Sequence, residues 1–187
     1  MTQMSGAKFL AETMHGYGVS HFFFMPVIVA DAMPEMERLG ITRVMAHSEK
    51  PAAYMADGYA RASRSVAFCG AQSVGANNLA AGLQDAYLAS SPVVALTGRL
   101  PQELQDRWAY QEVDHASPFS AVTKYSSRVN STDQLPMFLR QAIREATTGT
   151  PGPAHLDLAG IAGGDISTGE ADLDVVIVRV RSGQVPT

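Results

Sequence analysis

The chain has 187 residues, 46% of them hydrophobic and 17% charged, and this balance excludes a wholly disordered protein. Its formal net charge of -4 comes without a basic cluster, so nucleic-acid binding is not expected. The lone Cys69 cannot form an internal disulfide and no apolar run reaches the length of a membrane span, so we expect a cytoplasmic protein without a membrane segment.

Segments with helical and with strand periodicity alternate along the chain. Helices are predicted over 6–16, 33–39, 49–62, 76–89 and 132–146. Ser5 is the predicted cap of the first helix and Thr132 that of the last. Strands are predicted over 21–25, 42–46, 65–70, 92–97, 125–129 and 154–158.

This alternation predicts the fold class. Several of the six strands are unbroken apolar runs, which is typical of a parallel sheet covered on both faces. We therefore expect a doubly wound α/β domain with a six-stranded, mainly parallel sheet and helices on both faces. Ligands of such folds bind beyond the carboxyl ends of the strands. The loops after Met25, Ala46, Gly70 and Thr97 are therefore the ones to inspect.

The composition changes near the C-terminus. Gly, Ser, Asp and Glu dominate from Gly160 to Asp174, and the apolar run V-V-I-V follows at 175–178. We predict one domain over residues 1–163 and a linker over 164–187 that leads towards a further, central domain. The alternative is a tail that packs on its own domain.

Two of these loops carry polar residues that could do chemistry. Glu49 stands at a strand's carboxyl end and at a helix N-terminus, where the helix dipole by itself accounts for an acidic residue. The segment A-Q-S-V-G-A-N-N at 71–78 is small and polar, so a ligand could approach its backbone. It lacks the lysine of a P-loop and the spacing of a dinucleotide fingerprint.

A long loop over 98–118 interrupts the alternation and carries A-Y-Q-E-V-D-H at 109–115. A loop of this length is either functional or an oligomer contact. His115 could act as a base, and a capping or surface histidine is the other interpretation. His47 beside Glu49 could indicate a metal, but no further ligands are evident, and no serine stands in a nucleophile elbow.

Longer segments of the chain resemble one enzyme family. They are, in chain order, H-S-E-K-P-A-A-Y-M-A-D-G-Y-A-R, A-Q-S-V-G-A-N-N, L-Q-D-A-Y-L-A-S-S-P-V-V-A-L-T-G, A-Y-Q-E-V-D, V-T-K-Y and T-G-T-P-G-P-A-H-L-D-L. The family is the N-terminal pyrimidine-binding domain of thiamine-diphosphate enzymes of the acetolactate synthase type, and the resemblance covers about residues 4–160. It implies the thiamine-diphosphate-binding fold and decarboxylation of a 2-keto acid, with carboligation to a second carbonyl compound.

The resemblance also implies roles for particular residues. In the family one glutamate hydrogen-bonds N1′ of the cofactor's aminopyrimidine and exchanges a proton with it, and Glu49 matches that catalytic residue. The other cofactor-binding positions implied are Met25, Pro26, Gln72, Gly75, Asn78 and Gln111. The substrate-facing positions implied are Ile28, Tyr110 and Gln111.

The sequence departs from the family at the loop after the first strand. Val27 and Ile28 stand where a Gly-Gly pair is usual, and Phe24 replaces a customary glycine. These side chains are expected to narrow the space above the reactive carbon of the cofactor. A simple 2-keto acid decarboxylase, a carbon–carbon lyase and a non-catalytic cofactor-binding subunit are therefore the alternatives to an acetolactate synthase.

The family's G-D-G…N motif, which holds Mg2+ and the diphosphate, does not occur in these residues. The resemblance therefore implies that both are held by a second domain, in a longer parent chain or in a partner subunit, and that this chain alone is inactive. It implies a homodimer or tetramer, for which the alanine-rich face of 52–60 and the helix over 76–89 are the predicted contacts. FAD binding by the parent enzyme stays open.

Overall fold

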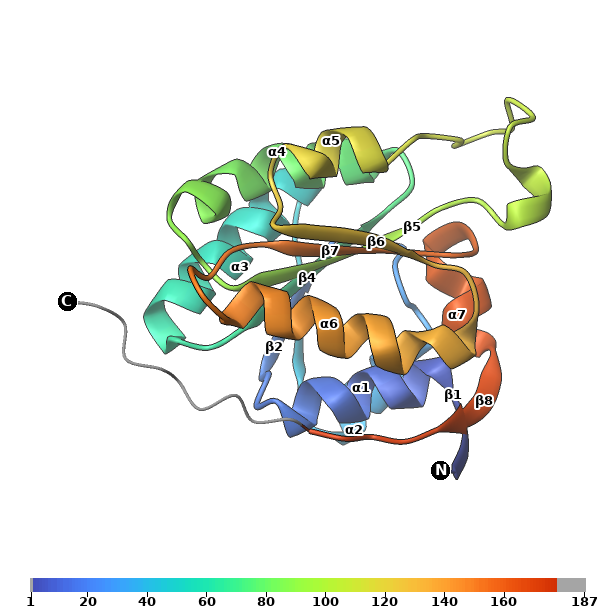
Figure 1. Cartoon of the computed structure of the whole chain (residues 1–187), viewed down its shortest axis with the longest axis horizontal. Helices are drawn as coiled ribbons and strands as arrows, with labels where there is room; N and C mark the ends of the chain where they lie inside the picture. Colours follow the sequence, from blue (N-terminus) through green and yellow to red (C-terminus); the bar gives the residue numbers. More distant parts are fainter. Residues whose placement is uncertain (1, 178–187) are drawn as a thin grey trace.

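The computed structural model describes residues 2–177, and its central feature is a single six-stranded sheet in which every strand pair is parallel (Figure 1). The strand order is β3-β2-β4-β5-β7-β6. These strands are β2 (His21–Phe24), β3 (Thr42–Met45), β4 (Ala67–Gln72), β5 (Val93–Gly98), β6 (Tyr125–Val129) and β7 (Ala154–Leu158). The predicted doubly wound α/β fold is confirmed, and each predicted strand occurs.

Helices cover both faces of the sheet (Figure 1). On one face lie α3 (Glu49–Ser63), α4 (Gly75–Leu88) and α5 (Ala116–Ser120). On the other lie α1 (Gly6–Gly16), α2 (Ala32–Arg38), α6 (Leu135–Thr147) and α7 (Gly164–Thr168). Short 3-10 turns occupy Gln102–Leu104, Thr132–Gln134 and Ile161–Gly163.

The strands divide their side chains between two apolar cores because successive residues point to opposite faces. Phe22, Phe68 and Leu96 lie in the core beneath α1 and α6. Phe23 and Cys69 lie in the core beneath α3 and α4. Burial of each large side chain contributes about 1.5–3 kcal/mol, so both layers of helices are held to the sheet by apolar contact.

The two predicted helix caps had different outcomes. Ser5 caps α1 as predicted, because its Oγ accepts a hydrogen bond of 3.3 Å from the backbone N–H of Lys8. The prediction for Thr132 is wrong. Thr132 lies inside the 3-10 turn that precedes α6, and its buried hydroxyl donates to the carbonyl of Ile166 at 3.2 Å. The hydroxyl therefore fastens the C-terminal segment and caps no helix.

The segment after residue 163 packs on the domain. A second, two-stranded sheet pairs β8 (Glu170–Leu173) antiparallel with β1 (Thr2–Ser5). In α7, the hydroxyl of Ser167 donates to Asp31 at 2.9 Å. The predicted boundary at residue 163 therefore falls inside folded structure that continues to Leu173. The stretch 174–177 has no regular secondary structure, and the rest of the predicted linker lies outside the described residues.

The alanine-rich face of α3 is buried inside the chain, so the prediction that it pairs subunits is corrected. Ala52, Ala53, Ala56 and Ala60 are all buried in the core shared with α4. Gly82 of α4 permits this close contact, because a Cβ there would lie 2.8 Å from that of Ala53. Within residues 2–177 the structure contains no helix that is both long and apolar enough to cross a membrane.

Candidate functional site

The loops that follow β2, β3, β4 and β5 open at the same edge of the sheet, because these four strands are parallel neighbours. They carry the residues to which the sequence assigns a function. The site is described below from its centre, where α3 and α4 begin, to the long loop over 99–115.

Glu49, Gly75 and Asn78 lie together at the centre of this edge. Glu49 is the first residue of α3, and its Oε2 accepts a hydrogen bond of 3.2 Å from the side-chain amide of Asn78. Gly75 is the first residue of α4, and a Cβ there would lie only 2.5 Å from Oε1 of Glu49. The half-buried carboxyl therefore occupies the space that a side chain at residue 75 would fill. The start of α3 and the start of α4 meet at it, and two helix N-termini favour an anion there.

The other predicted cofactor-binding residues at this edge lie at the end of β4 and in the loop after β2. Gln72 is the last residue of β4 and is half-buried. Met25 directly follows β2, and its backbone N–H donates to the carbonyl of Gly70 at 3.1 Å, which joins the loop to β4. Pro26 is exposed. The structure thus places all three at the carboxyl edge.

Two neighbours in the loop after β2 point in opposite directions. Ile28 is 1% exposed and packs in the core, where its Cγ2 comes within 3.2 Å of the position of a Cβ on Gly70. Val27 is 46% exposed. The side chain that this loop presents at the surface is therefore that of Val27, and Ile28 instead fills the space beneath the loop.

The long loop after β5 projects from the body of the molecule (Figure 1). Tyr110 is 85% exposed. Gln111, by contrast, is anchored, because its carbonyl accepts a hydrogen bond from the hydroxyl of Ser73. Among the described residues its buried side-chain oxygen has no hydrogen-bond partner. The loop thus brings Gln111, and not Tyr110, against the turn between β4 and α4.

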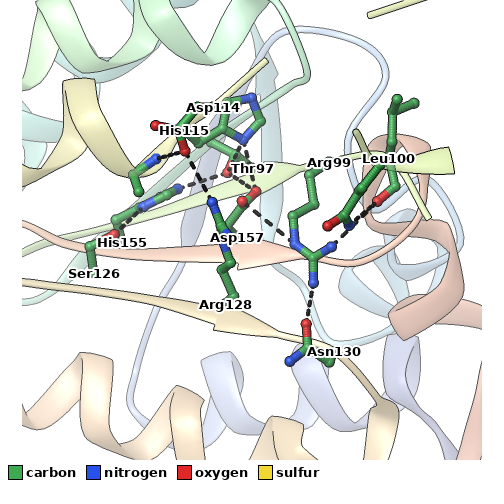
Figure 2. A network of polar contacts seen from close by, with 12 residues as sticks. Thr97, Arg99, Leu100, Asp114, His115, Ser126, Arg128, Asn130, His155 and Asp157 are labelled. Carbon is green, nitrogen blue, oxygen red and sulfur yellow. Dashed lines mark hydrogen bonds and ion pairs between the residues drawn. The ribbon is translucent and has the colours of Figure 1, made fainter. Parts of the chain in front are cut away.

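The end of this loop contains a residue that sequence reasoning interpreted wrongly. His115 is 1% exposed, and although it precedes α5 its side chain makes no capping bond, so neither the surface nor the capping interpretation holds. Its ring contacts Asp157 of β7 in a buried polar network with Thr97 and His155 (Figure 2). A detectable signal was present: His155 and Asp157 alternate with leucines in a strand predicted to be buried on both faces.

The network perturbs two titrating groups. Burial raises the pKa of Asp157, but the surrounding hydrogen bonds and charges, those of His115 first, together outweigh it, so the pKa lies below its usual value. Burial lowers the pKa of His155 to about 3, although the charge of Asp157 acts in the other direction. Asp157 is therefore a carboxylate and His155 a neutral imidazole at neutral pH. In the part of the chain that the structure covers, no group of three or more His, Cys, Asp or Glu side chains could hold a metal ion.

Comparison with known proteins identifies the family of this chain. Residues 4–117 match the family model described as thiamine pyrophosphate enzyme, N-terminal TPP binding domain, and the chain belongs to this family. It is 35% identical over 176 residues to the probable acetolactate synthase large subunit of Methanocaldococcus jannaschii, covering 91% of this chain and 29% of that protein. It is 36% identical over 183 residues to the acetolactate synthase isozyme 2 large subunit of Escherichia coli, covering 96% of this chain and 32% of that protein. The chain thus spans about three tenths of the length of these relatives.

Proposed function

We propose that this chain is the pyrimidine-binding half of a thiamine-diphosphate-dependent enzyme of the acetolactate synthase type, which decarboxylates a 2-keto acid and joins the product to a second carbonyl compound. Glu49 is the proposed catalytic residue. The observation that carries the proposal is the position of the Glu49 carboxyl, held by Asn78 in the space left free by Gly75. The acetolactate synthase relatives support this choice of reaction over the other 2-keto acid enzymes.

The residues present suit an aminopyrimidine ring. Such a ring needs one partner at N1′ and further acceptors for its amino group, with little side-chain bulk against its plane. Glu49 supplies the first, and the unpartnered side-chain oxygen of Gln111 is an available acceptor among the described residues. Gly75 supplies the free space. The other proposed contacts are Met25, Pro26, Gln72 and Asn78. When bound, thiamine diphosphate supplies the nucleophilic carbon that attacks the keto group.

Glu49 acts in this proposal by holding and moving one proton at N1′. Its carboxyl presents one oxygen to the ring while Asn78 fixes the other by a hydrogen bond of 3.2 Å. A carboxyl positioned in this way is a general acid and base, whose contribution to rate is typically about 10²–10⁴.

The remainder of the site is proposed to come from elsewhere. We place the Mg2+ and diphosphate ligands in a second domain, on a longer parent chain or on a partner subunit, within a homodimer or tetramer. Tyr110 and Gln111 face the substrate in this proposal, and Val27 takes the place assigned to Ile28 because its side chain is the exposed one. The chain by itself is then expected to turn over no 2-keto acid.

The experiment is a titration of the purified chain with the hydroxymethyl-aminopyrimidine half of thiamine, followed by NMR. We expect weak, saturable shifts of the backbone amides of Glu49, Gly75, Asn78 and Gln111. Glu49→Ala removes every hydrogen bond from residue 49 to the ring and should reduce the affinity by about tenfold or more. The matched control is His15→Gln, an exposed residue of α1 on the opposite face of the sheet, which should change nothing. Equal affinity of the Glu49→Ala chain and the unsubstituted chain would refute the proposal.

A further inference from the structure

Polar side chains cross three adjacent strands on the face covered by α5. Parallel register places Thr97 of β5 opposite Asp157 of β7, and Asp157 opposite Arg128 of β6. Two residues earlier in β7, His155 lies opposite Ser126 of β6. Thr97, His155 and Asp157 are all buried in a region where the neighbouring strand positions are apolar. The proposed function makes no use of this group.

The hydrogen atoms of His155 and Thr97 can be assigned from their partners. The hydroxyl of Thr97 donates its one hydrogen to Oδ1 of Asp157 at 2.8 Å. At Nε2 of His155, 2.7 Å away, the same oxygen must then accept, so that this ring nitrogen carries the hydrogen. Nδ1 of His155 is left to accept from the hydroxyl of Ser126 at 2.8 Å. His155 is thus a neutral ring with every polar atom paired.

The same reasoning gives His115 a hydrogen on both ring nitrogens. Its Nδ1 lies 2.8 Å from Oδ1 of Asp157, a carboxylate, and its Nε2 lies 2.9 Å from the carbonyl oxygen of Ser73. Neither oxygen can donate, so each ring nitrogen must. His115 is therefore a buried imidazolium. It is paired with the Asp157 carboxylate on one side (Figure 2) and bonded to the backbone carbonyl of Ser73 on the other.

The carbonyl that His115 binds belongs to the turn beside the candidate site. Ser73 directly follows β4, and its backbone N–H donates to the carbonyl of Gly98 at 2.8 Å. Its hydroxyl donates to the carbonyl of Gln111. Two residues further on, Gly75 leaves free the space that the Glu49 carboxyl occupies. Ser73 has a φ of 38° and Gln111 a φ of 67°, which non-glycine residues rarely adopt. Both backbone conformations are thus fixed by bonds that converge on Ser73.

We propose that His115 is a positioning residue: its ion pair with Asp157 holds the turn Ser73–Gly75, and through it Gln111, in the arrangement that the cofactor's pyrimidine requires. This inference rests on the proposed function of Glu49. The charged or titratable groups around His115 are His155 and Asp157 on β7, Arg128 on β6, Arg99 after β5 and the preceding Asp114. Asp157 alone among them bonds the ring directly, so it is the group to change.

The first test needs no substitution. NMR of the histidine ring nitrogens in the isotope-labelled chain at neutral pH should show two protonated nitrogens for His115. For His155 it should show a proton on Nε2 only. A spectrum in which His115 has one unprotonated ring nitrogen would overturn the proposal.

The second test is Asp157→Asn, which keeps the size and an acceptor but removes the charge. We expect His115 to become a neutral ring, the amide signals of Ser73, Gly75 and Gln111 to move, and the aminopyrimidine to bind about tenfold more weakly. His15→Gln is the control that should leave all three readouts unchanged. A neutral His115 with unmoved turn signals, or with unaltered pyrimidine affinity, would show that the ion pair positions nothing.

These outcomes separate the two proposals. If Glu49→Ala leaves pyrimidine binding intact, the function proposed for Glu49 fails. The ring-nitrogen spectrum and the turn signals in Asp157→Asn then still decide whether the ion pair holds the turn. If Glu49→Ala weakens binding and Asp157→Asn does not, the function stands and the positioning role fails.

Discussion

Gly75→Ala is the substitution that probes the candidate site most directly. The added Cβ would lie 2.5 Å from Oε1, 2.9 Å from Cδ and 3.0 Å from Cγ of Glu49, all well inside van der Waals contact. The Glu49 side chain must therefore turn away, which costs about 0.5–1.5 kcal/mol if it leaves its preferred rotamer. Alanine gains about 0.5–1 kcal/mol over glycine in the middle of a helix and less at its first residue, so the net loss of stability should be at most about 1 kcal/mol.

The effect on the site should be much larger than the effect on stability. With the carboxyl displaced, its bond to Asn78 and its contact with the pyrimidine are lost together, and aminopyrimidine affinity should fall by at least about tenfold. Thermal unfolding and the NMR titration of the purified chain measure the two quantities. Gly58→Ala in α3 is the matched control, since a Cβ there meets nothing within 4 Å and should only stabilise the helix. Gly75→Ala that binds the pyrimidine normally, or that is destabilised by several kcal/mol, would refute this account of the Glu49 carboxyl.

Three further predictions concern the acid, the buried histidine and the surface. In the complete enzyme that we propose, Glu49→Gln should slow proton exchange at C2 of the bound cofactor by about 10²–10⁴ with little change in melting temperature. Unchanged exchange would contradict the acid–base role. Burial lowers the pKa of His155 to about 3, so as the pH falls the unfolded chain protonates this histidine before the folded chain does. The contribution of neutral His155 to the free energy of unfolding should therefore be fully present above pH 6.5. It should fall towards pH 3 by up to about 1.4 kcal/mol per pH unit. His155→Gln should flatten this slope in urea unfolding, and an unaltered slope would argue against it. Light scattering should show a dimer or larger oligomer that Leu88→Glu weakens, since Leu88 is 73% exposed beside Tyr87; a monomeric unsubstituted chain would count against this surface.

Much of the fold could be predicted because the periodicity of the chain is strong. Short apolar runs such as Phe22–Phe24 and Val93–Leu96 have no alternation, which requires burial on both faces and therefore a parallel sheet. The pairing of β1 with β8 could not be predicted in the same way. Its partners Thr2 and Leu173 are separated by nearly the whole chain, and neither strand has an apolar pattern of its own.

The positions of the residues at the centre of the candidate site could be predicted from the sequence, but the environments of the residues at its edges could not. Glu49, Gly75 and Asn78 stand at the starts of regular helices, so their placement follows from the strand and helix boundaries. Ile28 lies in an irregular loop, where no repeating pattern in the sequence shows which side chain faces inward. The structure places it in the apolar core. His115 was misjudged because its partner Asp157 is distant in sequence, and only strand register shows that the two meet.

The cost of the turn at Ser73 explains why a buried ion pair belongs beside this site. Backbone conformations such as those of Ser73 and Gln111 cost on the order of 1–3 kcal/mol each and persist only where the surroundings hold them. A buried ion pair rarely gains stability over well-packed apolar side chains, so stability alone does not account for His115 and Asp157. What apolar residues cannot do at this position is bind the carbonyl of Ser73 and thereby orient the peptide that leads to Gly75. The ion pair therefore fixes the backbone conformation of the turn Ser73–Gly75. The Glu49 carboxyl fits against this turn because that conformation is fixed.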